Sequence, residues 1–112
     1  LTDQGLPNLS SVKDIGTLLS RIYRGECVDY AHDEKMLQIL ARQKDKDCLP
    51  SALPAFLVAN KTGEITGVYA DGGIAWSDAG DLILVVMDGN CHDRQETIAL
   101  FGQIVQRAAA SL

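Results

Sequence analysis

The 112-residue sequence lacks the features that mark several specialised classes of protein. It has no excess of positive charge, since its formal net charge is −5, and this argues against nucleic acid and anionic membrane surfaces as partners. No apolar run approaches the roughly 20 residues that a membrane-spanning helix requires. Aromatic residues make up 5% of the chain, apolar residues 46% and charged residues 22%, so the composition is that of an ordinary globular domain.

Cysteines are few and form no metal-binding motif. Cys27, Cys48 and Cys91 are an odd number, so they cannot all pair within one chain, and no CxxC or Cys/His spacing indicates a metal. We expect neither a metal nor a cofactor, and the simplest interpretation is that the cysteines are small buried residues or unreactive thiols. The sequence leaves open a Cys27–Cys48 bridge, which an exported protein would allow.

A recognisable start is also missing. The chain begins LTDQGLPNLSS, with no initiator methionine and no charged-then-apolar signal segment. We therefore expect a piece of a longer protein. Proteolysis, deliberate shortening and a naturally truncated gene would each give such a piece, and the sequence does not choose among them.

Three segments have helical spacing. Ser11 followed by Asp14 is typical of a capping box, and helices are predicted at about 11–25, 29–43 and 93–112. Their apolar sides are Val12, Ile15, Leu18, Leu19 and Ile22 in the first, Met36, Leu37, Ile39 and Leu40 in the second, and Ile98, Phe101, Ile104, Val105, Ala108 and Leu112 in the third.

Three strands are predicted between the second and third helices. A polar, proline-containing connector, 44–54, leads to strands at 55–62, 68–76 and 82–87. Residues 63–67 are predicted as a turn or bulge, glycines 72 and 73 loosen the second strand, and residues 77–81 form a hairpin turn. The third strand, LILVVM, is apolar throughout, so both of its faces should be covered.

The fold predicted from this order, α-α-β-β-β-α, is α/β (α+β): an antiparallel three-stranded sheet with helices packed on it. We expect one partial domain, residues 1–112, made of a helical segment, 9–54, and a sheet plus C-terminal helix, 55–112.

The segment VANKTGEITGVYADGG, 58–73, has the most specific chemistry. Lys61, Thr62 and Gly63 come at the predicted end of the first strand. The lysine adds a fixed positive charge, the threonine a hydroxyl donor, and the glycine lets a ligand approach the backbone. The backbone N–H of Glu64 would then face a developing oxyanion. Lys-Thr-Gly also occurs by chance, and an exposed hairpin end without function is the simplest competing interpretation.

The context of this motif resembles the last third of class A β-lactamases and related penicillin-recognising serine hydrolases. In both, a strand ending in Lys-Thr-Gly is followed by an antiparallel strand, which here carries Asp71, then an apolar strand and an amphipathic helix. The segments NLSSVKDIGTLLSRIYRGECV and DEKMLQILARQKDKDCLPSALP are similar to the paired helices that precede that strand. The resemblance extends from about Asn8 to Leu112 and implies an incomplete β-lactamase/transpeptidase-like αβα fold.

The resemblance implies a role for each residue of the motif. Lys61 and Thr62 would hold the substrate carboxylate, Gly63 would keep the strand edge open, and the Glu64 N–H would be one of two oxyanion donors. The parent would be a serine hydrolase that hydrolyses a β-lactam or a D-alanyl peptide amide through an acyl-enzyme. Its location would be the bacterial periplasm or the exterior.

The rest of that machinery is absent. The family needs a Ser-x-x-Lys nucleophile, a Ser-Asp-Asn loop and, in class A, a glutamate that positions water. Residues 10–13, SSVK, fit the first pattern but are better explained as helix caps. Residues 77–79, SDA, have the wrong third residue and follow Lys-Thr-Gly. We therefore expect that the chain carries a substrate clamp without a nucleophile and is inactive alone.

Other polar residues have simpler explanations. Asp71 is expected to be a satisfied polar residue at a glycine-rich bend, Trp76 to be core or edge cover, and the Glu64 side chain to tune or pair with Lys61. The residues expected on the surface are Glu26, Glu34, His32 and His92.

The strand at 82–87 is expected to have an open edge. Such an edge invites pairing, so we expect it to pair either with a missing N-terminal half or with a second copy in a two-fold dimer. The alternative to a hydrolase is a non-enzymatic dimerisation or regulatory module, roadblock- or profilin-like, which pairs edge strands and needs no nucleophile.

Overall fold

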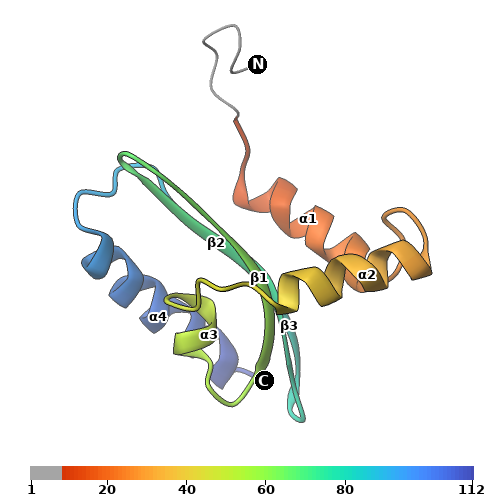
Figure 1. The fold of residues 1–112 in the computed structure, drawn as a ribbon. Helices are drawn as coiled ribbons and strands as arrows, with labels where there is room; N and C mark the ends of the chain where they lie inside the picture. Colours follow the sequence, from red (N-terminus) through yellow and green to blue (C-terminus); the bar gives the residue numbers. More distant parts are fainter. Residues whose placement is uncertain (1–8) are drawn as a thin grey trace, which may run out of the picture.

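The computed structural model describes residues 9–112 as four helices and three strands (Figure 1). The helices are α1 (Val12–Tyr23), α2 (Tyr30–Ala41), α3 (Leu49–Ala52) and α4 (Arg94–Ala110). The strands are β1 (Leu57–Ile65), β2 (Val68–Ser77) and β3 (Gly80–Asp88). Asn8, where the expected resemblance begins, lies outside the described residues.

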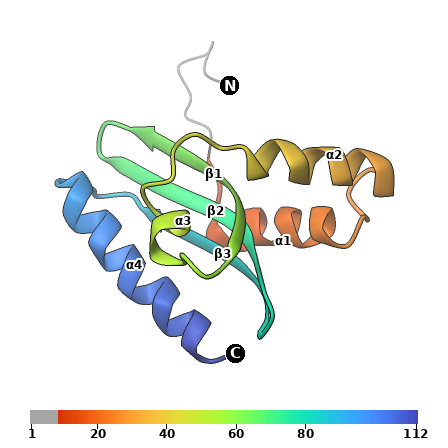
Figure 2. The ribbon, with the colours of Figure 1, turned by 60° about the horizontal axis from the view of Figure 1, so that its bottom comes forward.

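The elements form three layers. The strands make an antiparallel sheet in the order β1-β2-β3, which confirms the predicted α+β class. Helices α1 and α2 lie against one face of the sheet, while α3 and α4 lie against the other (Figure 2). In the part of the chain that the structure describes, none of the helices is long and apolar enough to cross a membrane.

The three long helices begin where the sequence predicts, because each has a side-chain cap. Ser11 Oγ accepts a hydrogen bond from the Asp14 N–H at 3.1 Å, and Asp29 Oδ1 accepts one from the His32 N–H at 2.8 Å. Asp93 caps α4 in the same way. These caps satisfy backbone donors that the first turn of a helix leaves free.

The connector and the first turn differ from the prediction. The connector is not simply polar, because its second half forms α3 and buries Cys48, Leu49, Ala52 and Leu53 beneath α4. Strand β1 continues past the predicted turn to Ile65, since residues 63–65 pair with β2, and the turn is only Thr66-Gly67. The Lys-Thr-Gly motif therefore lies within a paired strand rather than at its end.

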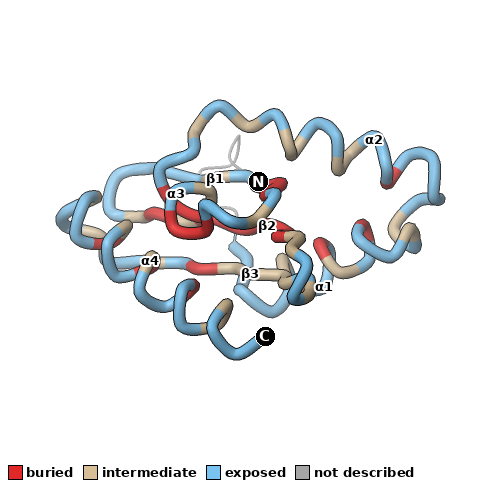
Figure 3. The backbone as a smooth tube through the Cα atoms, turned by 90° about the horizontal axis from the view of Figure 1, so that it is seen from below, coloured by how far each residue is buried: buried red, intermediate tan, exposed pale blue. Residues whose placement is uncertain are grey.

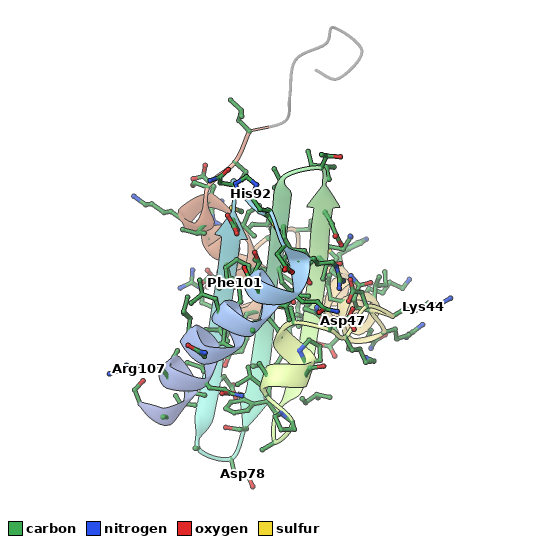
Figure 4. All side chains as sticks on the ribbon, turned by 90° about the vertical axis from the view of Figure 1, so that its left-hand side faces the viewer. Lys44, Asp47, Asp78, His92, Phe101 and Arg107 are labelled. Atoms are coloured by element: carbon green, nitrogen blue, oxygen red, sulfur yellow. The ribbon has the colours of Figure 1, made fainter. Side chains whose placement is uncertain are left out.

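The main core lies between the sheet and the helices α3 and α4. Tyr69 and Val105 are fully buried there, and the Tyr69 and Phe101 rings lie 6.2 Å apart. Figure 3 shows the buried stretches of α3 and of the sheet in red, and Figure 4 labels Phe101 on α4. On the other face, Gly72 packs against α1. The alternation of a strand therefore gives β2 two covered faces, which is why residues 71–75 are all buried.

Several residues that the helical patterns predicted to be covered are exposed. Strand β3 is also only half covered, because it is at the sheet edge, and of its predicted residues 82–87 only Val86 is buried. The residues of the predicted helical stripes that are exposed, with their exposed fractions, are Val12 48%, Leu18 45%, Ile39 65%, Ile104 50% and Leu112 45%.

All three cysteines are free, so the Cys27–Cys48 bridge that the sequence left open is not formed. Cys48 is buried in the core, and the Cys91 thiol lies 3.3 Å from Thr97 Oγ1.

The glycines of β2 were expected to loosen the strand, but both are paired in the sheet, and Gly73 lets β2 approach β1 closely. A Cβ atom on Gly73 would lie 2.4 Å from the Ala59 carbonyl oxygen and 2.8 Å from Asn60 Cβ. Both contacts are with an edge strand that is itself hydrogen-bonded, so neither can relax freely.

We expect Gly73→Ala to destabilise the fold by about 1–3 kcal/mol, because the new methyl group forces β1 and β2 apart. Urea unfolding monitored by circular dichroism measures this. Gly89→Ala is the matched control, because a Cβ there meets nothing within 4 Å, and it should change stability by about 0.5 kcal/mol or less. Equal stabilities of the two variants would contradict the argument.

Candidate active site

The Lys-Thr-Gly motif lies on β1, which is an edge strand among the described residues. Lys61 and Gly63 pair with Gly72 and Ala70, and their side-chain positions face the α1 side of the sheet. Thr62 pairs with Asp71 and belongs to the opposite face. The motif therefore presents its groups on both sides of one strand.

The backbone of Glu64 turns its N–H towards the open edge. The two-residue turn Thr66-Gly67 is closed by a hydrogen-bonded pair, Ile65 with Val68. Hydrogen-bonded and non-hydrogen-bonded pairs alternate along an antiparallel ladder, so Glu64 and Thr62 direct their backbone groups away from β2. This is the orientation that an oxyanion donor on this strand requires.

A cavity of about 330 Å³ lies beside the motif. Most of its wall is apolar, and Lys61, Thr62, Gly63 and Asp71 form its polar part. Lys61 itself is exposed, and its Nζ donates a hydrogen bond to the Thr62 carbonyl oxygen at 2.6 Å. Among residues 9–112 no carboxylate pairs with it. The residues of the apolar wall are Ile15, Leu18, Leu19, Ile22, Leu40, Ala70, Gly72, Val85 and Met87.

A larger cavity, of about 580 Å³, lies at the other end of the strands, where Leu57 and Trp76 are paired. Trp76 lines it with Tyr23, and the two rings are 6.4 Å apart. Trp76 is half-buried, which agrees with its expected role as edge cover. None of the three motif residues lines this cavity.

The Glu64 side chain does not pair with Lys61, contrary to expectation. The two side chains are on opposite faces of β1, because adjacent residues of a strand alternate. Arg94, at the start of α4, binds Glu64 instead, with Nε 3.0 Å from Oε1 and 3.1 Å from Oε2. From the sequence, residues 93–96 were predicted only to begin a helix.

Asp71 is a satisfied buried residue, as expected, but it lies within a regular strand and not at a bend. Its Oδ1 accepts a hydrogen bond from Asn60 Nδ2 at 3.0 Å, and its Oδ2 accepts one from the Leu49 N–H at 3.0 Å. Burial raises the pKa of Asp71, and the hydrogen bonds from Asn60 and Leu49 oppose that rise. This carboxylate thus holds β1 and the start of α3 together.

Neither Cys48 nor Tyr69 fits the role of a nucleophile or base. Burial raises the pKa of the Cys48 thiol to about 12, with the charge of Asp71 adding to the effect. Burial also raises the pKa of Tyr69, whose hydroxyl has no hydrogen-bond partner in the described part of the chain. Both groups therefore stay protonated near neutral pH.

The pattern matches and surface residues to which the sequence assigned no catalytic role lie away from the motif. Ser11 is the cap of α1, and Asp78 is at the tip of the β2–β3 hairpin, far along the sheet (Figure 4). His32 is exposed and hydrogen-bonded to Asp29, and His92 is exposed in the loop before α4. Glu26 and Glu34 are exposed as well. Within residues 9–112, no cluster of His, Cys, Asp and Glu is arranged to hold a metal ion.

Sequence reasoning missed two residues near the motif. Asn60 had a usable signal, because it alternates with Val58, and a polar residue on a core-facing position needs a partner. Arg94 had none, because its partners come from distant parts of the chain and meet only in the folded protein.

The fold and the edge motif together define a β-lactamase-like arrangement. A model of the family described as "Beta-lactamase enzyme family" matches residues 2–112, so the chain belongs to that family. A search of curated proteins gives no match.

Solved structures of the same class share this fold. "Structure of PBP-A" matches with a TM-score of 0.81 and 27% identity, covering 100% of this chain and 44% of that chain. The beta-lactamase from Sphaerobacter thermophilus matches with a TM-score of 0.78 and 22% identity, covering 88% of this chain and 40% of that chain. The chromosome-encoded beta-lactamase of Vibrio parahaemolyticus gives 0.76 and 15%, covering 91% and 41%. The chain thus spans less than half the length of each.

The buried carboxylate predicts a pH-dependent stability. The native pKa of Asp71 is above its ordinary value, so the native state holds this proton more tightly than the unfolded chain. The stability that this proton contributes is fully present below the unfolded pKa and is lost as pH rises through the native pKa. Asp71→Asn lacks this titration. Between about pH 4 and pH 8, urea unfolding should show the free energy of unfolding of the variant rising relative to that of the wild type as pH rises. A constant difference would contradict the assignment.

Proposed function

We propose that this chain is the C-terminal portion of a serine hydrolase of the class A β-lactamase type. It supplies the substrate clamp, and a segment outside residues 9–112 supplies the serine. The observation that carries the proposal is the position of Lys61-Thr62-Gly63 beside a cavity, on a strand edge that is open among residues 9–112, with the neighbouring Glu64 N–H directed outwards.

The clamp would bind the carboxylate and the acyl carbonyl of the substrate separately. The Lys61 ammonium and the Thr62 hydroxyl lie on opposite faces of β1 and would reach a carboxylate at its outer edge from the two sides, while the Glu64 N–H would donate to the oxygen of the acyl carbonyl. Serine attack would form a C–O bond and place negative charge on that oxygen. The C–N bond would then break, with a proton passing to the leaving nitrogen, and water would hydrolyse the acyl-enzyme.

The substrate class follows from the two groups that the clamp would bind. A β-lactam and a D-alanyl peptide both carry a carboxylate beside the acyl bond, so both fit the clamp. One of the matching structures is a PBP-A variant described as an acyl-enzyme complex with penicillin G, at 27% identity and a TM-score of 0.74. A hydrolase of this type would act in the periplasm or outside the cell, where such substrates occur.

The clamp predicts a loss of activity when its charge is removed. In the complete protein that contains this chain, Lys61→Ala should lower kcat/KM for nitrocefin about 100-fold, because the carboxylate loses its cationic partner. Lys44→Ala, which removes an exposed lysine from the loop before α3, is the control and should leave kcat/KM unchanged. The 112-residue chain alone should not hydrolyse nitrocefin. Turnover by that chain, abolished by Lys61→Ala, would overturn the division of roles.

The intact mass and upstream sequence of the source protein test the proposal independently. A longer protein with a Ser-x-x-Lys segment before residue 1 supports the hydrolase. A natural product of 112 residues favours the alternative, a roadblock- or profilin-like dimerisation module, to which none of the matches reported above belongs.

We further propose that the β3 edge pairs with another strand, either from an N-terminal half or from a second copy. The edge is flanked by exposed apolar residues, since Met87 is 36% exposed and Leu18 and Ile104 are about half exposed. Pairing would cover this surface and satisfy the outward backbone groups of β3.

Hydrogen exchange tests the pairing at particular amides. The β2–β3 ladder is closed by Ser77 and Gly80, so alternation directs the N–H groups of Ile83, Val85 and Met87 outwards. These three amides should exchange slowly when a partner strand is present and rapidly in a monomer, while those of Leu82, Leu84 and Val86 stay protected in both. Rapid exchange of the first set in the complete protein would contradict the pairing.

A further inference from the structure

The Arg94 side chain gathers three acidic residues from two other segments. Its Nε binds both carboxylate oxygens of Glu64, and its Nη2 lies 3.0 Å from Asp47 Oδ2 and 3.7 Å from Asp45 Oδ2. The guanidinium carbon also lies 5.3 Å from the centre of the Tyr69 ring, directly across the ladder from Glu64. One side chain at the start of α4 therefore joins the end of β1 to the loop before α3. Asp47, in that loop, is labelled in Figure 4.

A second contact holds the same end of the hairpin. The Cys91 N–H donates a hydrogen bond to the Gly67 carbonyl oxygen, in the β1–β2 turn, at 2.9 Å. Residues 91–94 therefore hold both the turn and the strand end that precedes it. The Glu64 N–H belongs to one of the two attached residues, on an edge strand that has no partner on its outer side among the described residues.

Glu64 places a negative charge where the proposed function requires an anion to bind. Its N–H would receive an oxyanion, and a free carboxylate on the same residue would repel that charge within a few ångströms. Lys61 is on the other face of the strand and does not pair with this carboxylate. Arg94 both neutralises it and holds it on the α4 side of the sheet.

We propose that Arg94 is a positioning residue of the hydrolase: it holds the Glu64 carboxylate away from the oxyanion site and fixes the direction of the Glu64 N–H. This inference rests on the function proposed above. Arg94 acts through Glu64 and not on the substrate, because two of its three nitrogens already bind carboxylates of this chain.

A double-mutant cycle in the complete, active protein tests this role. Arg94→Gln should lower kcat/KM for nitrocefin about 10-fold, mainly through kcat, because the oxyanion donor is loosened and an unpaired carboxylate is left beside it. Glu64→Gln should cost about threefold by itself, through loss of the anchor. In the Glu64→Gln background, Arg94→Gln should cost only about twofold, since the carboxylate beside the oxyanion donor is already gone. Arg94→Lys should retain part of the kcat/KM that Arg94→Gln loses, because lysine keeps the charge but lacks the planar group that binds Glu64 and Asp47 together.

Arg24→Gln is the matched control, because it breaks another exposed Arg–Glu pair, with Glu26 at 3.5 Å, and should leave kcat/KM unchanged. Melting temperatures of all variants separate loss of function from loss of fold. Equal losses from Arg94→Gln in both backgrounds contradict the inference, and so does a rise in KM with kcat unchanged. If the wild-type protein hydrolyses no substrate, the proposed function fails together with this inference. Additive losses in an active enzyme overturn this inference alone.

Discussion

The buried carboxylate of Asp71 is the interaction on which the arrangement of the motif depends. It accepts one hydrogen bond from Asn60, the residue before Lys61, and another from the backbone at the start of α3. A buried acceptor of this kind is costly unless both partners stay in place. The Asp71 carboxylate on β2 therefore holds both the strand that carries Lys-Thr-Gly and the connector before that strand.

The two ends of the motif are held by different kinds of contact. Asn60 and Asp71 are 1% exposed and act where water does not compete, whereas Arg94 and its carboxylates are partly exposed and are screened by solvent. The first contact is suited to holding the fold, since its loss leaves a buried polar group without a partner. The second is suited to tuning the direction and the charge of the strand end.

The exposed apolar surface of this chain is consistent with its covering less than half the length of the related structures. Apolar residues on α1, β3 and α4 remain exposed around one edge of the sheet, and the chain spans only 40–44% of the length of the three structures compared above. In an ordinary domain both faces of a strand that is apolar throughout are covered by the chain itself. Exposed residues of this kind are typical of a surface that contacts further protein.

The sequence by itself determined the elements whose causes are local. Ser11, Asp29 and Asp93 begin helices because each caps its own first turn, and the strand predicted at 68–76 is confirmed because hairpin partners are neighbours in the chain. The tertiary structure alone decided the end of β1, the burial of the connector and the contacts of Arg94. The last two depend on groups 20 or more residues apart, such as Leu49 with Asp71 and Arg94 with Glu64, whose meeting no local pattern encodes. The end of β1 depends instead on its pairing with β2 across the turn, Ile65 with Val68.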